Sequence, residues 1–269
     1  MVVPKVGDRD DRSLFGVFDG HGDDGHFVSE FLVQRMPELL LAQPHLEEMP
    51  TDAFVSAFAA TSEALMKSSI DCSLSGSTGV CVLLNRRKII CANVGDSRAV
   101  LASVDAQGRY TAMALSDDHK PNRPDEMKRI REHGGRVVQR CGQRGWPEGP
   151  FRVWLPNDDV NALAMSRAFG DLKAASFGVT AIPEIVEHDV RACDKFIIIV
   201  RCMFSLVTLE IKNGFIGFAA AVFNPRTQYS SINQSVSSIY LSIYLSIYLS
   251  IYLSIYLSIS RCHCSLRLF

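Results

Sequence analysis

A short apolar run near the start of the chain ends in acidic and imidazole side chains. Residues 14–18 predict a buried strand, and Asp19-Gly20-His21-Gly22 follows it directly. Two interpretations fit this cluster. It is a turn, since Asp and Gly are common turn residues, or it is a ligand site. In the second case Asp19 and nearby carbonyls offer oxygen ligands to a hard cation, and His21 transfers protons near neutral pH.

Three more polar clusters interrupt apolar runs further along the chain. Each of them alone fits turn chemistry or a solvated run of charges. Their sequences are Asn93-Val94-Gly95-Asp96-Ser97-Arg98, Asp117-Asp118-His119-Lys120-Pro121 and Ser166-Arg167-Ala168-Phe169-Gly170-Asp171.

Together, the four clusters and their flanks resemble consecutive blocks of one family, the metal-dependent type-2C (PPM-type) protein serine/threonine phosphatases. The resemblance covers about residues 13–200. It implies an α+β fold in which helices flank two packed antiparallel β-sheets, an αββα sandwich. The matching blocks read FGVFDGHG, GSTGVCVL, ANVGDSRAVL, LSDDHKPNRPDEMKRIREHGGRV and LAMSRAFGD.

The resemblance implies a site for two Mg²⁺ or Mn²⁺ ions. Asp19 is implied to bridge them, the Gly20 carbonyl to bind one, and Asp118 to be linked to a further metal position. His21 is implied to be the general acid for the leaving alkoxide. Two metal ions close together generate hydroxide and neutralise charge on phosphoryl oxygens. The expected reaction is therefore hydrolysis of phosphoserine or phosphothreonine in a protein substrate.

The remaining acids of these blocks receive less definite roles. Asp96 lies in a tight turn, and we expect it to be structural and to bond neighbouring amides. Asp171 fits two roles equally, one near the metals and one in turn formation or packing. Asp23 stands where the family has a second glycine; it is either solvated charge or an acid that tunes metal affinity.

The cations of these blocks also leave alternatives open. Arg98 and Arg167 are suited to phosphate, although arginines paired at the edge of a core are commoner. His119 and Lys120 are expected to be solvated loop residues.

Parts of the family pattern have no counterpart at either end. Members carry a phosphate-binding arginine before the first strand, which KVGDRDDRS does not match, and neither Arg9 nor Arg12 is favoured as a stand-in. After Val200 the family's Asp-Gly and Asp-Asn blocks are missing, and no aspartate follows Asp194. We therefore expect a fold truncated after about residue 200 and a weak or inactive phosphatase. The alternatives are a catalytically dead phosphoprotein-binding module and a chain that does not fold.

The pattern of apolar residues predicts the elements that position these clusters. Helices are expected at 25–41, where Pro37 would kink or split the helix, and at 52–67 and 124–135. The runs 77–85, 88–94 and 97–104 predict an antiparallel meander. Helices and strands are segregated, which is typical of the α+β class. Further strands are expected at 136–139, 151–155, 161–165, 184–190 and 195–200.

The chain divides by composition into a partial phosphatase domain at 1–200 and three further segments. These are an unassigned apolar tail at 201–234, a low-complexity repeat at 235–260 and an unassigned tail at 261–269. Five identical Ser-Ile-Tyr-Leu units fill 238–257. The tetranucleotide TCTA, repeated, encodes this unit, so a translated intron is the favoured explanation. The repeat is also a weak transmembrane candidate and, as a strand, prone to aggregation.

The overall composition fits a globular protein that binds no nucleic acid. Hydrophobic residues make up 47%, the net charge is −1, and no cluster of Lys and Arg interleaves with aromatic residues. The cysteines form no CxxC pair, and Cys81 and Cys91 lie in apolar runs, which predicts buried, reduced thiols. The first residues do not resemble a signal peptide. We therefore expect a cytoplasmic or nuclear monomer.

Overall fold

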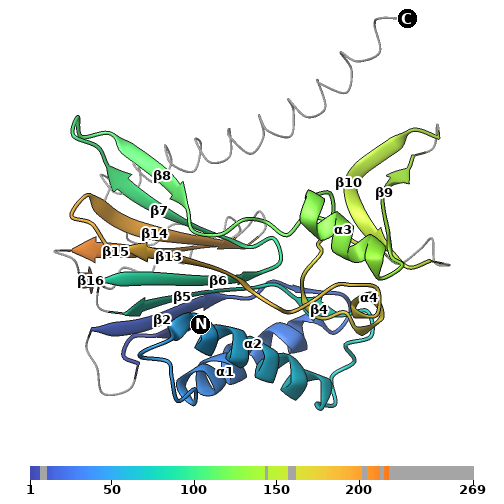
Figure 1. The fold of residues 1–269 in the computed structure, drawn as a ribbon, viewed down its shortest axis with the longest axis horizontal. Helices are drawn as coiled ribbons and strands as arrows, with labels where there is room; N and C mark the ends of the chain where they lie inside the picture. Colours follow the sequence, from blue (N-terminus) through green and yellow to red (C-terminus); the bar gives the residue numbers. More distant parts are fainter. Residues whose placement is uncertain are drawn as a thin grey trace, which may run out of the picture. The chain divides into compact units, whose positions relative to one another are not determined.

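The computed structural model describes residues 1–6, 11–85, 87–142, 145–156, 162–201, 205–212 and 215–217. All of them lie in the first of two compact units, Met1–Asn224; the second is Pro225–Phe269. Figure 1 shows the first unit as layers of antiparallel sheet with helices on one face, which confirms the α+β class. Most of the segments predicted beyond residue 200, including the repeat, fall outside the described residues.

The first large sheet has the strand order β1-β2-β5-β6-β13, and all of its pairs are antiparallel. Its central strand β5 is buried on both faces. Val80 and Val82 point into one apolar cluster, while Cys81 and Leu83 point into another, as the alternation of side chains along a strand requires. The strands are β1 (Val2–Val3), β2 (Arg12–Val17), β5 (Gly79–Asn85), β6 (Lys88–Val94) and β13 (Glu184–Asp189).

The second large sheet packs against the first through the cluster that contains Phe15, Val82, Leu101 and Ile197. Its order is β16-β15-β14-β7-β8. The predicted meander is therefore wrong at its third strand: β6 and β7 lie in different sheets, and the turn at 95–97 crosses between them. Its strands are β7 (Arg98–Val104), β8 (Tyr110–Ala114), β14 (Asp194–Arg201), β15 (Ser205–Lys212) and β16 (Phe215–Gly217).

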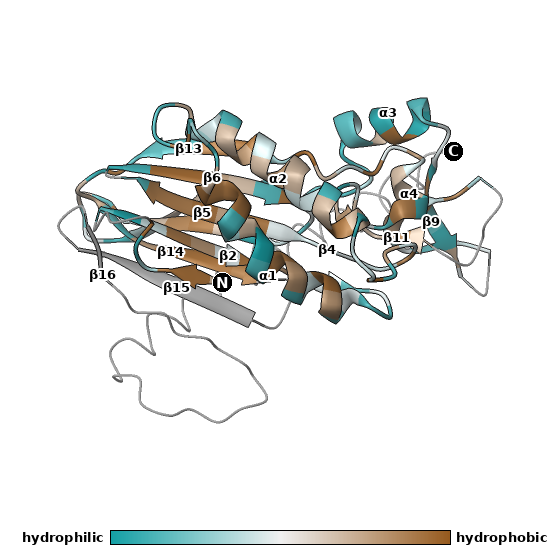
Figure 2. Ribbon diagram, turned by 90° about the horizontal axis from the view of Figure 1, so that it is seen from below, coloured by the Kyte–Doolittle hydropathy of each residue, from teal (hydrophilic) through white to brown (hydrophobic). Residues whose placement is uncertain are grey.

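Two helices cover the outer face of the first sheet (Figure 1). They are α1 (Gly25–Leu41) and α2 (Pro50–Met66). Helix α1 runs through Pro37 without ending, so the predicted split did not occur. Its buried stripe is Val28, Leu32, Met36 and Leu40, at a spacing of four. Figure 2 shows apolar residues concentrated in the central strands beneath these helices.

Several large apolar residues of these helices face solvent. Phe27 is 50% exposed, Val55 40% and Met66 53%. These residues lie beside the buried residues of each helix, and the core does not cover them.

After the β7–β8 hairpin, the chain forms a smaller substructure. Helix α3 (Pro124–Glu132) packs against a sheet of order β11-β10-β9. A separate apolar cluster that includes Ile130, Val137 and Val153 joins them. The strands are β9 (Arg136–Cys141), β10 (Pro147–Trp154) and β11 (Ala162–Leu163), and a short helix, α4 (Leu172–Ala175), comes later.

A third small sheet joins segments that are far apart in the sequence. Its strands are β3 (Gly20–His21), β4 (Gly76–Ser77) and β12 (Phe169–Gly170), in the order β12-β4-β3. Gly76 is in register with His21 on one side and with Gly170 on the other. This sheet brings together two of the polar clusters of the sequence, 19–22 and 166–171, with the start of the block GSTGVCVL between them.

The thiols in the core are reduced, as predicted. Cys72, Cys81 and Cys91 are free and buried, and burial raises the pKa of Cys81 to about 12. Among the residues that the structure describes, no helix is both long enough and apolar enough to cross a membrane.

Truncation of Phe58 tests how the helical layer is attached to the third sheet. The Phe58 ring on α2 is fully buried. Its centroid lies 5.3 Å from the ring centroid of Phe169 on β12. We expect Phe58→Ala to lower the free energy of unfolding by about 3–5 kcal/mol, because it leaves a cavity. The matched control, Val55→Ala, is on the same helix but 40% exposed. Urea titrations in which Phe58→Ala costs no more than Val55→Ala would contradict this packing.

Candidate active site

The backbone of Asp19 is fixed where strand β2 ends. Its N–H donates to the Thr78 hydroxyl at 3.0 Å, and its carbonyl accepts from the Thr78 N–H at 3.0 Å. The Thr78 hydroxyl also lies 2.7 Å from that of Ser97. Thr78 and Ser97 are fully buried, so this chain of bonds ties Asp19 to the turn that contains Asp96.

That turn can approach Thr78 only because residue 95 is glycine. Gly95 has φ +99°, and a Cβ there would lie 2.6 Å from the Thr78 methyl carbon. Next to it, the buried carboxylate of Asp96 lies 2.5 Å from the ammonium of Lys120. The expectation that Lys120 is merely solvated is therefore wrong, since it forms an ion pair with Asp96.

His21 is held by a buried carboxylate. Its Nε2 lies 2.6 Å from Asp171 Oδ2, and Asp171 is only 4% exposed. The two residues are 150 positions apart in the chain, and the third sheet brings them together. Asp171 was one of the residues for which sequence reasoning left two roles open.

Nearby charges favour the protonated form of His21. Burial alone would lower the pKa of His21, but the hydrogen bond and charge of Asp171, together with the charges of Asp96 and Asp19, outweigh burial and raise it. Three carboxylates from three different blocks thus act on one imidazole. A histidine in this setting carries the proton that a general acid needs.

Carboxylate oxygens are the ligands that Mg²⁺ and Mn²⁺ prefer, and Asp19, Asp96 and Asp171 all lie close enough to act on His21. The acids of the described residues that lie close enough together to share one ion are instead Asp125, Glu126 and Glu184. Gly20, the predicted carbonyl ligand, packs so tightly on Gly25 that a Cβ would lie 2.0 Å from the Gly25 oxygen. The assignments of Asp19 and Gly20 as metal ligands and of His21 as acid stay predictions.

Asp118, the third predicted ligand, has a cationic partner. Its Oδ1 accepts a hydrogen bond from Arg98 Nε at 2.9 Å, and its side chain is 20% exposed. This confirms the commoner alternative for Arg98, a paired arginine at the edge of the core. The link between Asp118 and a metal stays a prediction.

The arginines near the chain start do not supply a phosphate site among the described residues. Arg12 is buried in β2, donates to Asn85 at 3.2 Å and lies 3.3 Å from Glu47. Arg9 is not among the described residues.

A cavity of about 380 Å³ opens beside the His21–Asp171 pair. One wall consists of these two residues, and the other belongs to the β9–β10–β11 sheet and the segment after it. The guanidinium of Arg152 lines this second wall and donates to the Ala162 carbonyl at 3.1 Å. The cavity is also lined by Leu74, Leu163 and Met165.

A fully buried glutamate, Glu126, anchors the segment that leads to Asp171. Glu126 on α3 has 0% exposure. Its carboxylate accepts hydrogen bonds from Arg129 at 2.6 Å, from Arg167 at 2.8 Å and from the Ser166 hydroxyl. These bonds outweigh the cost of burial and hold the pKa of Glu126 well below its usual range.

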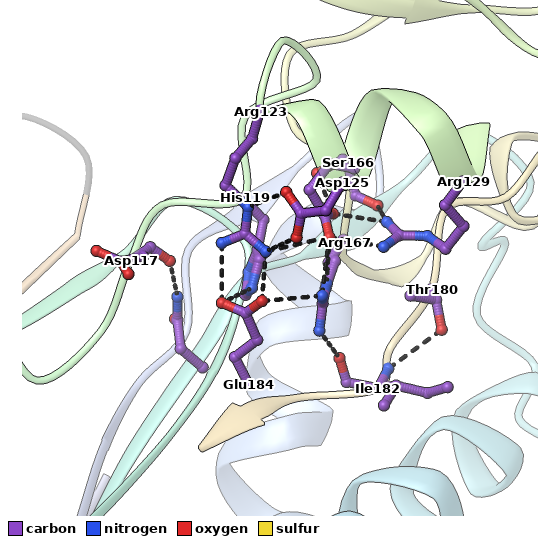
Figure 3. A network of polar contacts seen from close by, with 12 residues as sticks. Asp117, His119, Arg123, Asp125, Arg129, Ser166, Arg167, Thr180, Ile182 and Glu184 are labelled. Atoms are coloured by element: carbon purple, nitrogen blue, oxygen red, sulfur yellow. Dashed lines mark hydrogen bonds and ion pairs between the residues drawn. The ribbon is translucent and has the colours of Figure 1, made fainter. Parts of the chain in front are cut away.

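The network continues to the start of β13. Glu184 pairs with Arg123 and, at 3.1 Å, with Arg167, as Figure 3 shows. Arg167 is thus engaged by carboxylates, which confirms the paired alternative. Asp125, Glu126 and Glu184 lie close enough to suit a metal ion. Because Arg123, Arg129 and Arg167 already neutralise them, we assign this cluster a structural role.

The prediction that His119 is solvated is wrong. Its side chain has 0% exposure. Nδ1 lies 3.0 Å from the Gly95 N–H nitrogen, and Nε2 lies 3.2 Å from Glu184 Oε2. Sequence reasoning missed both His119 and Glu126 as members of this network, because their partners come from other blocks.

Neutralising Glu126 tests the anchor. Glu126→Gln leaves Arg129 and Arg167 without their shared charge, and we expect the free energy of unfolding to fall by about 3 kcal/mol or more. The control is Asp125→Asn, next in the chain but 60% exposed, for which we expect a loss below about 1 kcal/mol. Similar urea midpoints for the two variants would argue against the anchor.

The buried His119 predicts a pH dependence of stability. Burial, followed by the charge of Arg167, lowers the pKa of His119 from 6.5 to about 4. Between these values the unfolded chain binds more protons, so the free energy of unfolding should decrease as the pH falls from 6.5 to about 4. The decrease should be smaller in His119→Gln. An identical pH dependence in both proteins would show that His119 does not contribute.

Comparisons with known proteins agree with this arrangement. The family description "Protein phosphatase 2C" matches residues 3–201. The chain is 39% identical over 202 residues to "Probable protein phosphatase 2C 72" of Arabidopsis thaliana, covering 70% of this chain and 59% of that protein. It is 42% identical over 207 residues to "Probable protein phosphatase 2C 64" of Oryza sativa subsp. japonica, covering 74% and 48%. The chain thus spans about half to three-fifths of these relatives.

A solved structure shares the fold. The serine-threonine phosphatase 2C of Toxoplasma gondii superposes with a TM-score of 0.62 at 22% identity, over 74% of this chain and 70% of that one. Because the family match covers most of the chain and the polar blocks meet around His21, the chain belongs to the protein phosphatase 2C family.

Proposed function

We propose that this chain hydrolyses phosphoserine and phosphothreonine in protein substrates with the help of bound Mg²⁺ or Mn²⁺. The observation that carries the proposal is the His21–Asp171 pair, set in the field of Asp19 and Asp96 beside a cavity. The alkoxide that leaves a phosphoserine is a poor leaving group and needs a proton. His21 holds that proton at the edge of the cavity.

The oxygen chemistry of Asp19 and Gly20 supports the metal dependence. Asp19 and Gly20 would hold a divalent ion, with Asp96 and Asp171 adding negative charge close by. Such an ion, when bound, supplies an activated water and neutralises charge on the phosphoryl oxygens. The chain's own contribution is to fix the backbone of Asp19 in advance through the Thr78 and Ser97 bonds.

The charges available within the chain limit the expected activity. Asp96 faces Lys120, Asp118 faces Arg98 and Asp171 faces His21, so their charges are partly compensated. Two divalent ions would bring four positive charges, and no aspartate follows Asp194. Repulsion between close ions is strong, several kcal/mol even at an effective dielectric of about 20. We therefore propose one ion near Asp19 and slow turnover.

The experiment measures phosphate release from a phosphoserine peptide by the 269-residue chain with Mn²⁺ and with EDTA. We expect slow, Mn²⁺-dependent release that Asp19→Asn abolishes, because a ligand charge is lost next to the ion. Asp52→Asn, an exposed site on α2, makes the same charge change and should retain the parent rate.

Two results would overturn the proposal. Residual activity of Asp19→Asn within a few-fold of the parent would remove Asp19 as a ligand. A parent chain that binds the phosphopeptide without metal-dependent release would instead be a binding module.

A further inference from the structure

We propose that Asp171 is a positioning residue that holds His21 in one orientation and one tautomer for proton transfer to the leaving oxygen. This inference rests on the proposed function for its purpose, but the contacts that carry it are independent of the reaction. They concern the backbone of Asp171, the direction of its side chain, and the space through which that side chain reaches His21.

The backbone at Asp171 adopts a left-handed conformation that favours glycine. Its φ is +47°, and among the described residues no other non-glycine residue has a positive φ. Glycine adopts this left-handed conformation without the steric penalty that a Cβ brings. If the turn alone mattered, glycine would serve better at position 171. The carboxylate therefore has a use that offsets this strain.

The carboxylate is not used to cap the helix that follows it. Asp171 occupies the N-cap position of α4, where an aspartate normally accepts a hydrogen bond from an amide of the first turn. Here it makes no such bond. Its Oδ2 instead lies 2.6 Å from His21 Nε2.

The contact between Asp171 and His21 has room because position 76 of the third sheet carries no side chain. Gly76 is in register with both His21 and Gly170, so it stands between the two strands that carry the pair. A Cβ at Gly76 would lie 2.2 Å from Asp171 Oδ2. The carboxylate therefore occupies the space where any other residue at position 76 would place its side chain.

The contact assigns different roles to the two imidazole nitrogens. Because an ionised carboxylate only accepts hydrogen bonds, the Nε2 proton points at Asp171. Nδ1 is buried and has no hydrogen-bond partner among the described residues. The contact thus holds the ring through Nε2 and leaves Nδ1 as the nitrogen without a partner in the described part of the chain. Fixing the ring in this way spares the reaction the cost of orienting it.

The first test observes the His21 side chain by NMR and requires no catalytic turnover. In the metal-free 269-residue chain labelled with ¹⁵N-histidine, we expect a strongly downfield Nε2 proton that disappears in His21→Gln, which assigns it. Asp171→Gly and Asp171→Asn should lose or shift this signal, and both residues accept a left-handed backbone. Lys173→Ala, on the exposed side of α4, should leave it unchanged. A signal that is unaltered in both Asp171 variants would overturn the proposal.

The second test compares leaving groups with Mn²⁺ present. General acids contribute about 10²-fold or more where the leaving group needs a proton. We therefore expect Asp171→Gly and His21→Gln to slow release from a phosphoserine peptide by about 10²-fold and from an aryl phosphate by less than about tenfold. The double variant should be no slower than His21→Gln alone, because both changes remove one function.

Equal losses on the two substrates, or additive losses in the double variant, would show that Asp171 acts only on the structure of the turn. If the parent chain releases no phosphate with Mn²⁺, the proposed function fails. The NMR comparison then still decides whether Asp171 holds His21.

Discussion

A carboxylate that no water can reach must be neutralised by the protein, and Glu126 imposes this constraint on the molecule. Its partners Arg129, Arg167 and Ser166 come from α3 and from the segment that runs into β12. A buried charge of this kind tolerates little displacement, because losing one partner leaves the charge uncompensated. The segment is thereby fixed in position just before Phe169. The position of Asp171, which directly follows β12 of the third sheet, therefore depends on this anchor.

The site itself uses small residues and hydroxyls where its carboxylates converge. Thr78 and Ser97 join the end of β2 to the turn between the two large sheets. Gly76 and Gly95 allow close approach at two places where a Cβ would collide. None of these residues carries charge. They set the distances between groups that do, which is how a site can gather acids against their mutual repulsion.

Sequence patterns predicted the bounds of helices and strands better than they predicted which strands pair with each other. The apolar spacing gave the bounds of α1 and the extents of β5 and β6, since burial of one stripe or of both faces leaves a periodic trace. The pairing of β7 with β14 instead of β6 left no such trace, because the same alternation fits either partner. The block order pointed to Asp19 and His21, whose roles stay predictions. The burial of His119 and Glu126 could not be found, since a polar residue in the sequence does not reveal a partner 40 or more positions away.

The apolar clusters differ in how they share strands. The clusters on the two faces of β5 and β6 have these strands in common, whereas the cluster beneath α3, β9 and β10 contains no residue of either strand. Loss of one face of the shared strands exposes the other, so the sandwich opens as a single cooperative unit. The Glu126 network ties the α3 cluster to the sandwich, in place of shared strands. One wall of the cavity belongs to each part. A shift of α3 and its sheet would therefore change the width of the cavity, while His21 lies on the opposite wall.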